Sequence, residues 1–504
     1  MKKLCLFTTF LIINIYGNSQ VFNIVYPSIR PELITVDAVS LTIPLKNNEA
    51  YFISRGIPLI GPYYYYRIAT KVDRTGEVLW HKYISDSLGY FTPRHFEFIS
   101  NNRIMLAGFK YPPERDIAKY WYGIFDIEMN MLEEHIYSGT HNKADITHFL
   151  ISDNGDYVFS ALDNMLDDRG NGATDKVKAV VFSTDSTGQM KWYYEMWDSL
   201  RPKDLYTANK VMEDSQGNFY AFGGFLTSGE FPNWKGLVIK MSPSGKLLWH
   251  KIYPIAGYGV SFYSVLSLAN DQFLLVGHSA DPINFFNDRA ESYIYSIVMD
   301  TSGTILKSNF KNKSFSNSLS DCVLKMDSTL VCGGNHRPIK DQWTDGRIFS
   351  MTMDADIIWE SVIDNVDYRQ EEISDFAGAP DGGYYLGGYS WLKDNNQARN
   401  WLVKTDSLGC DDVSCLDTAV DDPTVGTDEV WLYPNPVHDR IHIASPGGFR
   451  SRQFEIYDYT GKKVKVVQSD LGLERITIPM TNLQSGIYLI SPIDRSWHRS
   501  FVKE

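Results

Sequence analysis

The sequence predicts an all-β protein, a seven-bladed β-propeller followed by a small immunoglobulin-like β-sandwich. Three observations indicate this fold class. Aromatic residues make up 14% of the 504 residues, and aromatic side chains favour pleated, half-buried strands. A unit of about fifty residues with two turn signals recurs along most of the chain. Roughly the last seventy residues alternate apolar and polar positions, as strands with one buried face do.

The N-terminus has the pattern of a secretory signal peptide. Lys2 and Lys3 precede an apolar run from Leu4 to Tyr16, and small or polar residues follow. We expect residues 1–20 to be removed during export; a buried N-terminal strand is the alternative. The run is too short to span a bilayer. No later segment approaches 18 uninterrupted apolar residues, so we expect no transmembrane segment in the mature chain.

The first repeated signal is an extended segment that ends in Asp, a turn with Gly, and an extended segment that often holds Trp. Clear copies are KVDRTGEVLW at 71–80 and FSTDSTGQMKW at 182–192. In such a turn Asp bonds its own backbone and Gly takes the left-handed conformation. The aligned positions are Asp73, Asp126, Asp185, Ser242, Asp300, Asp354 and Asp406.

The second signal is a polar turn followed by an apolar strand that ends in Gly or Gly-Gly, as in QGNFYAFGGF at 216–225. It also occurs seven times, and another extended run precedes each copy. Each unit therefore holds four short strands, which is typical of a propeller blade. We expect Trp80, Trp192 and Trp249 to fill the wedge between adjacent blades. The order of signals resembles the kelch type of propeller, which implies a scaffold and says little about activity.

The last unit lacks a fourth strand, because CDDVSC follows its Asp-Gly turn. The apolar segment VFNIVYPSI at 21–29 is left over at the other end of the propeller region. We expect this N-terminal segment to pair with the last blade and close the ring, which removes two exposed sheet edges.

Both tight turns of a blade lie at one end, so the longer connections gather at the other. Long loops on a rigid scaffold often carry function. Aromatic residues in these loops are the expected ligand face for a protein or glycan, although local packing on the blade ends is an alternative reading. They are Phe231, Trp234, Phe285, Phe286 and Trp343.

The sequence contains no HExxH, GxSxG or P-loop motif, and we expect no catalytic residue, no metal and no cofactor. The net charge of −13 argues against a nucleic-acid partner. The sequence thus favours a binding protein over an enzyme. The alternative is a secreted hydrolase or lyase that acts on polysaccharide with acidic residues in the propeller funnel.

Four cysteines remain once the signal peptide is removed: Cys322, Cys332, Cys410 and Cys415. An even number in an exported chain indicates disulfides. We favour two local pairs, Cys322 with Cys332 across a hairpin and Cys410 with Cys415, although four cysteines allow three connectivities.

Residues 416–430 contain five acids and no base or aromatic ring, which predicts a flexible linker. Beyond it, LYPNPVHDRIHI, IYDYTGKKV and LQSGIYLI follow in order, with a basic residue near the end. These motifs resemble the type A C-terminal sorting domain of type IX secretion, a family of the Bacteroidota. A generic immunoglobulin-like binding module is the alternative. The expected domains are therefore 1–20, 21–415, 416–430 and 431–504.

The resemblance implies a route through the periplasm to the cell surface or the medium. The outer-membrane type IX translocon and its sorting machinery would be the partners, and the tail would be removed within the linker. The motif positions carried over are Tyr433, Pro434, Asn435, Pro436, Gly461, Lys462, Gly486, Tyr488 and Lys503.

Overall fold

The computed structural model is all-β, with no helix among the residues that it describes. The chain divides into two compact units, Met1–Val413 and Ser414–Glu504. The described residues are 21–27, 34–58, 66–84, 90–111, 117–139, 143–166, 174–201, 204–227, 234–255, 259–280, 292–314, 316–325, 327–337, 344–363, 368–392, 397–411, 431–433, 437, 440–444, 453–458, 462–468, 475–493 and 499–503.

The first unit consists of antiparallel four-stranded meanders. The first or inner strands are β2 (Ile34–Pro44), β6 (Tyr90–Ser100), β10 (Lys143–Ile151), β14 with β15 (Leu205–Tyr206, Lys210–Glu213), β19 with β20 (Gly259–Val260, Ser264–Leu268), β24 (Ser316–Leu324) and β28 (Tyr368–Gly378). The second strands are β3 (Ala50–Pro58), β7 (Arg103–Tyr111), β11 (Tyr157–Leu166), β16 (Phe219–Leu226), β21 (Gln272–Ala280), β25 (Leu330–Arg337) and β29 (Tyr384–Leu392).

The remaining strands of each meander lie farther out. The third strands are β4 (Tyr66–Val72), β8 (Lys119–Asp126), β12 (Thr174–Thr184), β17 (Lys235–Met241), β22 (Ser292–Asp300), β26 (Asp345–Met351) and β30 (Ala398–Thr405). The fourth strands are β5 (Val78–Tyr83), β9 (Met131–Tyr137), β13 (Met190–Met196), β18 (Leu247–Tyr253), β23 (Ile305–Ser314), β27 (Ile357–Ile363) and β1 (Phe22–Val25).

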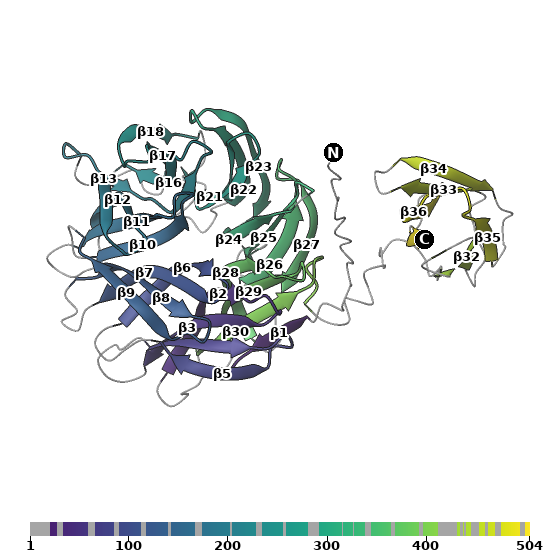
Figure 1. Cartoon of the computed structure of the whole chain (residues 1–504), viewed down its shortest axis with the longest axis horizontal. Helices are drawn as coiled ribbons and strands as arrows, with labels where there is room; N and C mark the ends of the chain where they lie inside the picture. Colours follow the sequence, from purple (N-terminus) through teal and green to yellow (C-terminus); the bar gives the residue numbers. More distant parts are fainter. Residues whose placement is uncertain are drawn as a thin grey trace, which may run out of the picture. The chain divides into compact units, whose positions relative to one another are not determined.

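The inner strands lie nearest the centre of this unit and the fourth strands lie at its rim (Figure 1). Each inner strand contacts the inner strand of the next meander, and β28 also contacts β2. The apolar core lies between adjacent meanders: Tyr51 and Ile53 of one meander share a buried cluster with Leu106 and Trp121 of the next. A single meander could not bury both of its faces, so adjacent meanders stabilise one another.

The turn between the third and fourth strands has the expected chemistry. Asp73 Oδ1 accepts hydrogen bonds from the backbone N–H groups of Thr75 (2.8 Å) and Glu77 (2.9 Å), and Gly76 has φ of +83°. Equivalent bonds are accepted by Asp126, Asp185, Asp300 and Asp406, and by the hydroxyl of Ser242.

In the sixth turn the sequence alignment of the Asp positions was wrong, because it placed Asp354 there. Thr352 occupies the Asp position there, because its Oγ1 accepts the N–H groups of Asp354 and Asp356, each at 3.2 Å. Asp354 lies two residues farther on and pairs with Lys307. A threonine hydroxyl can take the place of a carboxylate in this bond, so the turn keeps its shape without Asp.

The fourth strand of one meander packs against this turn of the next. A Cβ on Gly245 would lie 2.3 Å from the Trp192 ring, and one on Gly303 would lie 2.7 Å from Trp249. The wedge role expected for these two tryptophans is thus confirmed. Trp80 packs against a core that the first two meanders share.

The N-terminal strand β1 supplies the fourth strand of the last meander. It pairs antiparallel with β30, from Phe22 opposite Lys404 to Val25 opposite Trp401. The Trp401 Nε1–H also donates to the Asn23 side chain at 2.6 Å. The expected pairing between the N-terminal segment and the last meander is therefore confirmed for the described residues.

The second unit contains two small antiparallel sheets, ordered β31-β32-β35 and β34-β33-β36-β37. Ile443 and Ile478 of the first sheet share a buried core with Phe454 and Ile490 of the second, which makes this unit a two-sheet sandwich. Its strands are β31 (Trp431–Tyr433), β32 (Arg440–Ala444), β33 (Gln453–Asp458), β34 (Lys463–Gln468), β35 (Arg475–Pro479), β36 (Gly486–Pro492) and β37 (Arg499–Lys503).

Candidate functional site

Every inner strand of the first unit departs from regular pairing with its second strand, and it does so at the corresponding position of each meander. Five strands have register shifts, for example between Leu319 and Asp321 in β24 and between Ile373 and Asp375 in β28. In the two other meanders the inner strand is interrupted, at 207–209 and at 261–263. Such β-bulges insert an extra residue and redirect the side chains that follow.

Glycines of the second strand allow these bulges to pack closely. A Cβ on Gly108, Gly334 or Gly388 would lie within 2.0 Å of a carbonyl oxygen in the neighbouring inner strand. No residue other than glycine fits at such a distance. The Gly or Gly-Gly signal in the sequence therefore identifies the part of the second strand that packs against the bulge.

The bulged residues fasten adjacent meanders together. Thr147 Oγ1 donates to the Ala208 carbonyl oxygen at 2.6 Å, and Ser320 Oγ donates to that of Ile373 at 2.9 Å. Asn209 likewise donates to the Phe262 carbonyl oxygen at 3.0 Å. Leu41, which follows the bulge of β2, packs into the apolar core between the first two meanders, whereas the residue that follows each of the other irregularities is polar.

We call these following residues the post-bulge set: Leu41, His95, His148, Lys210, Ser264, Asp321 and Asp375. Six of the seven are polar, although they come from inner strands far apart in sequence. They are the candidate functional site.

Asp321 is the most connected member of the set. It accepts hydrogen bonds from Ser264 Oγ at 2.5 Å and from the Cys322 N–H at 2.8 Å, and Lys210 Nζ pairs with it at 3.4 Å. These donors come from three successive meanders, so Asp321 links the inner strands of all three.

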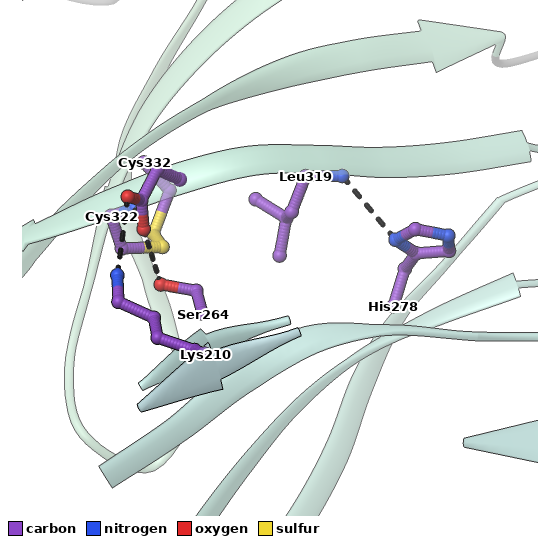
Figure 2. Close-up of a disulfide and its surroundings, with 7 residues drawn as sticks. Lys210, Ser264, His278, Leu319, Cys322 and Cys332 are labelled. Carbon is purple, nitrogen blue, oxygen red and sulfur yellow. Dashed lines mark hydrogen bonds and ion pairs between the residues drawn. A yellow bond between two sulfur atoms is a disulfide. The ribbon is translucent and has the colours of Figure 1, made fainter. Parts of the chain in front are cut away.

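The disulfide Cys322–Cys332 lies directly beside this group, with Lys210 and Ser264 close by (Figure 2). The two cysteines are opposite each other on β24 and β25, with their Cα atoms 4.1 Å apart. The first predicted disulfide is thus confirmed, and it fixes the strand that carries Asp321. Cys415 lies outside the described residues, so the pairing of Cys410 with Cys415 stays a prediction.

Asp375 has the opposite environment to Asp321. The Thr42 N–H donates to its Oδ2 at 2.5 Å. Burial, opposed by this bond and aided by the negative charge of Asp321, raises the pKa of Asp375 to about 7. Among the described residues no cation pairs with it. The set therefore contains a carboxyl group, on Asp375, that titrates near neutral pH.

The other side of the set carries imidazoles. The rings of His95 and His148 stack with their centroids 4.0 Å apart. Burial, with the nearby His95 and Lys210, lowers the pKa of His148 well below its usual value, so this ring is neutral. His148 is 9% exposed and its Nδ1 has no hydrogen-bond partner.

No group of three or more His, Cys, Asp or Glu side chains in the described part of the chain is arranged to hold a metal ion. No helix among those residues is long and apolar enough to cross a membrane.

The structure describes only one residue of the ligand face expected from the sequence. The ring of Trp234 packs against Gly224, where a Cβ would lie 2.8 Å away, and its carbonyl oxygen accepts the Val260 N–H at 2.9 Å. Trp234 is therefore engaged in local packing. Phe231, Phe285, Phe286 and Trp343 lie outside the described residues.

The sorting motif is described in part. Tyr433 ends β31, Lys503 ends β37, and Gly486 opens β36 opposite Lys503. Tyr488 stacks on Phe501 at 5.7 Å. The Lys462 N–H donates to Asp458 at 3.1 Å. Pro434, Asn435, Pro436 and Gly461 lie outside the described residues.

The post-bulge set was missed in the sequence, although a signal for it exists. Each member lies four residues before the first residue of the turn that joins the first and second strands of its meander. Asp321 precedes Lys325 in this way and Asp375 precedes Ala379, and these two turns close with hydrogen bonds from Ser328 and Gly382.

Comparison with known proteins identifies the tail. Residues 431–497 match the secretion system C-terminal sorting domain family. This type IX sorting domain indicates export to the cell surface or secretion, and it implies interaction with the type IX secretion machinery. No curated protein matches the chain.

Several solved structures resemble the chain in fold alone. A protein of unknown function from Dyadobacter fermentans is 12% identical, with 77% of this chain and 98% of that chain covered and a TM-score of 0.42. The β-propeller domain of the Trilobed protease from Pyrococcus furiosus is 10% identical, with 73% and 94% covered and a TM-score of 0.39. Polysaccharide lyase Uly1 is 8% identical, with 78% and 94% covered and a TM-score of 0.41.

Proposed function

We propose that this protein is an exported β-propeller that binds an extracellular glycan or protein through the central end of its blades. The sorting-domain match at 431–497 carries the export half of the proposal. The binding half rests on the post-bulge set, in which polar side chains from successive strands meet on a rigid scaffold. Residues 1–20 act as the signal peptide, and the linker at 416–430 is where the tail is removed.

The propeller of this proposal has seven blades and is closed. Two contacts support closure: β28 touches β2, and β1 of the N-terminus pairs with β30 of the last meander. The pairing of β1 with β30 covers the edge that β30 would otherwise expose.

Export is tested with a reporter that carries residues 1–20 at its N-terminus and residues 416–504 at its C-terminus, expressed in a host with type IX secretion. We expect the reporter at the cell surface or in the medium. A matched fusion that ends at residue 430 should stay in the periplasm. Retention of the full fusion in the periplasm would refute the assignment.

Binding is tested with the purified mature chain on a glycan array and by capture of surface proteins. The Lys210→Ala and Asp321→Asn variants should each lose the signal, because they remove the two partners of one ion pair. The variant Lys251→Ala removes a rim lysine that bonds the Ser302 carbonyl oxygen, and it should bind like the wild type. Equal binding by all of these variants would exclude the post-bulge set as the site.

A second function has specific support, hydrolysis of a polysaccharide in the funnel. Asp375 is a carboxyl group whose pKa burial raises to about 7, as is typical of the general acid in a glycoside-hydrolysing pair, and Asp321 is a second carboxyl group on the neighbouring inner strand. Reducing ends released from a polysaccharide panel, and abolished by Asp375→Asn, would establish the enzyme. Binding without release would leave the protein a receptor.

A further inference from the structure

The two sheets of the sorting domain differ in the side chains that they present to solvent. The exposed positions of β32 and β35 include Arg440, Arg475 and Thr477. β34 and the end of β36 instead expose aliphatic side chains. They are Val464 (37% exposed), Val466 (45%), Leu489 (36%) and Ile493 (55%). A sheet with one buried face normally turns polar residues to water on the other, so the outer side of the second sheet departs from this pattern.

The exposed aliphatic side chains flank one row of β33. Ile456 of β33 lies in the core of the sandwich, so its neighbours Glu455 and Tyr457 point outward. On β34, Val466 lies opposite Glu455. On β36, Leu489 lies opposite Tyr457. We name the outer aliphatic surface by its four residues, Val464, Val466, Leu489 and Ile493.

β34 is also an edge of its sheet. Its one strand partner among the described residues is β33, so one side of its backbone has no strand beside it there. The strand carries two lysines: Lys463 pairs with Glu455 at 2.8 Å, and Lys465 bonds the Pro479 carbonyl oxygen. Antiparallel pairing with β34 of a second copy would bring these lysines together, which is unfavourable. The edge therefore suits a different protein better than a second copy.

The family match gives a reason for an exposed apolar surface on this unit. The matched residues, 431–497, contain the whole of β33, β34 and β36, and a sorting domain implies interaction with the type IX secretion machinery. A contiguous apolar surface on a folded domain is characteristic of a protein interface. Residues 431–504 contain ten basic and seven acidic residues, so charge complementarity favours an acidic partner.

We propose that the outer aliphatic surface and the adjoining edge of β34 form the docking site for an outer-membrane component of the type IX machinery. This inference rests on the export half of the proposed function and names the surface that export uses. The partner is apolar where it meets Val466 and Leu489, and acidic where it meets Lys463 and Lys465. Such an apolar centre with a charged rim is typical of protein interfaces. The outer side of the other sheet, which carries Thr477, stays outside the contact.

The first test is export of the full chain from a host with type IX secretion. Val466→Asp places a carboxylate at the centre of the contact, and burial of an unpaired charge is costly. We expect the exported amount to fall at least about tenfold, the effect of ~1.4 kcal/mol of lost binding. Thr477→Asp makes the matched change at an exposed position of the other sheet and should be exported like the wild type. An unchanged melting temperature of each purified chain shows that it is folded.

The second test identifies the partner and does not depend on a loss of export. A photo-crosslinking amino acid replaces Val466 in the full chain or, as the control, Thr477. We expect position 466 to form an adduct with an outer-membrane component of the type IX machinery, identified by mass spectrometry. Position 477 should form no such adduct.

The outcomes separate this inference from the export assignment. Retention of the wild-type chain in the periplasm overturns both. Normal export of the wild type and of Val466→Asp overturns the docking surface alone, and so does an equal loss in Val466→Asp and Thr477→Asp. An adduct of position 466 with a second copy, or with the first unit of the same chain, refutes the machinery as the partner of this surface.

Discussion

The Tyr26 hydroxyl donates a hydrogen bond of 2.8 Å to the Gly76 carbonyl oxygen, 50 residues later in the chain. Tyr137 makes the same bond to Gly188 and Tyr253 makes it to Gly303, each at 2.6 Å. Those two bonds join consecutive meanders. Tyr26 instead follows β1, which completes the last meander, and Gly76 belongs to the first. The bond from Tyr26 to Gly76 thus joins the last meander to the first in the same way that the other two bonds join consecutive meanders.

The first prediction follows from this bond. Tyr26→Phe removes the donor and should lower the free energy of unfolding by about 1 kcal/mol, the usual net value of a buried hydrogen bond. Tyr253→Phe, at an internal contact, should cost a similar amount. Deletion of residues 21–29 should cost much more, since it also removes the pairing with β30. Denaturant midpoints measure all three, and an unchanged midpoint after the deletion would contradict the role of β1.

The second prediction tests the packing between meanders with two glycines of similar backbone conformation. Gly245 has φ of +78° and Gly382 has φ of +87°. A Cβ would lie 2.3 Å from Trp192 at the first position and would meet nothing within 4 Å at the second. Gly382→Ala should cost about 1 kcal/mol from backbone strain alone. Gly245→Ala should cost about 1–3 kcal/mol more, because it overpacks the contact. Equal losses in chemical denaturation would show that Trp192 does not hold the two meanders together.

The turns could be predicted from sequence because their chemistry is local. The bonds accepted by Asp73 span four residues, and the same pattern of letters returns wherever the turn returns. The sixth turn shows that residue types alone do not always identify the positions within a turn. Thr352 makes the bond with its hydroxyl and Ala355 takes φ of +60° in place of a glycine, so the sequence placed Asp354 in the wrong position of a correctly predicted turn.

The candidate site could not be predicted in the same way, because its members meet only through the third dimension. Lys210 and Asp321 are 111 residues apart, and neither belongs to a motif. A bulge of one extra residue decides which side chains face the centre, and period-two alternation alone places them on the wrong face. Aromatic loops attract attention in a sequence, whereas the polar residues before the first turn look like ordinary strand positions.

The third prediction concerns pH and Asp375. Its folded pKa of about 7 lies above its ordinary value of 3.8, so the folded state binds more protons than the unfolded state between these values. The stability that this group contributes is present at pH 4 and is lost as the pH rises through 7. In Asp375→Asn this loss is absent, so the difference in unfolding free energy between pH 4 and pH 8 should shrink by about 1–3 kcal/mol.

Asp185 provides the control of opposite sign for that experiment. Hydrogen bonds from the Thr187 side chain and the Gln189 N–H lower the pKa of Asp185. Its contribution is therefore present at neutral pH and is lost as the pH falls below its ordinary range. Asp185→Asn should change stability in the acid range and leave the slope between pH 5 and pH 8 unchanged. An identical pH profile for wild type and Asp375→Asn would show that Asp375 is ionised throughout.

The fourth prediction concerns the disulfide beside the candidate site. A bridge between cysteines separated by 10 residues stabilises a chain by about 2–3 kcal/mol through the entropy of the unfolded state. In a background in which Cys410 and Cys415 are alanine, a reductant should lower the denaturant midpoint by that amount. The further change Cys322→Ala with Cys332→Ala should remove the response. Since Cys322 directly follows Asp321 and donates its N–H to that carboxylate, the same variant should also weaken ligand binding at the post-bulge set. A loss of stability with full affinity would mean that the Lys210 and Ser264 contacts position Asp321 without help from the disulfide.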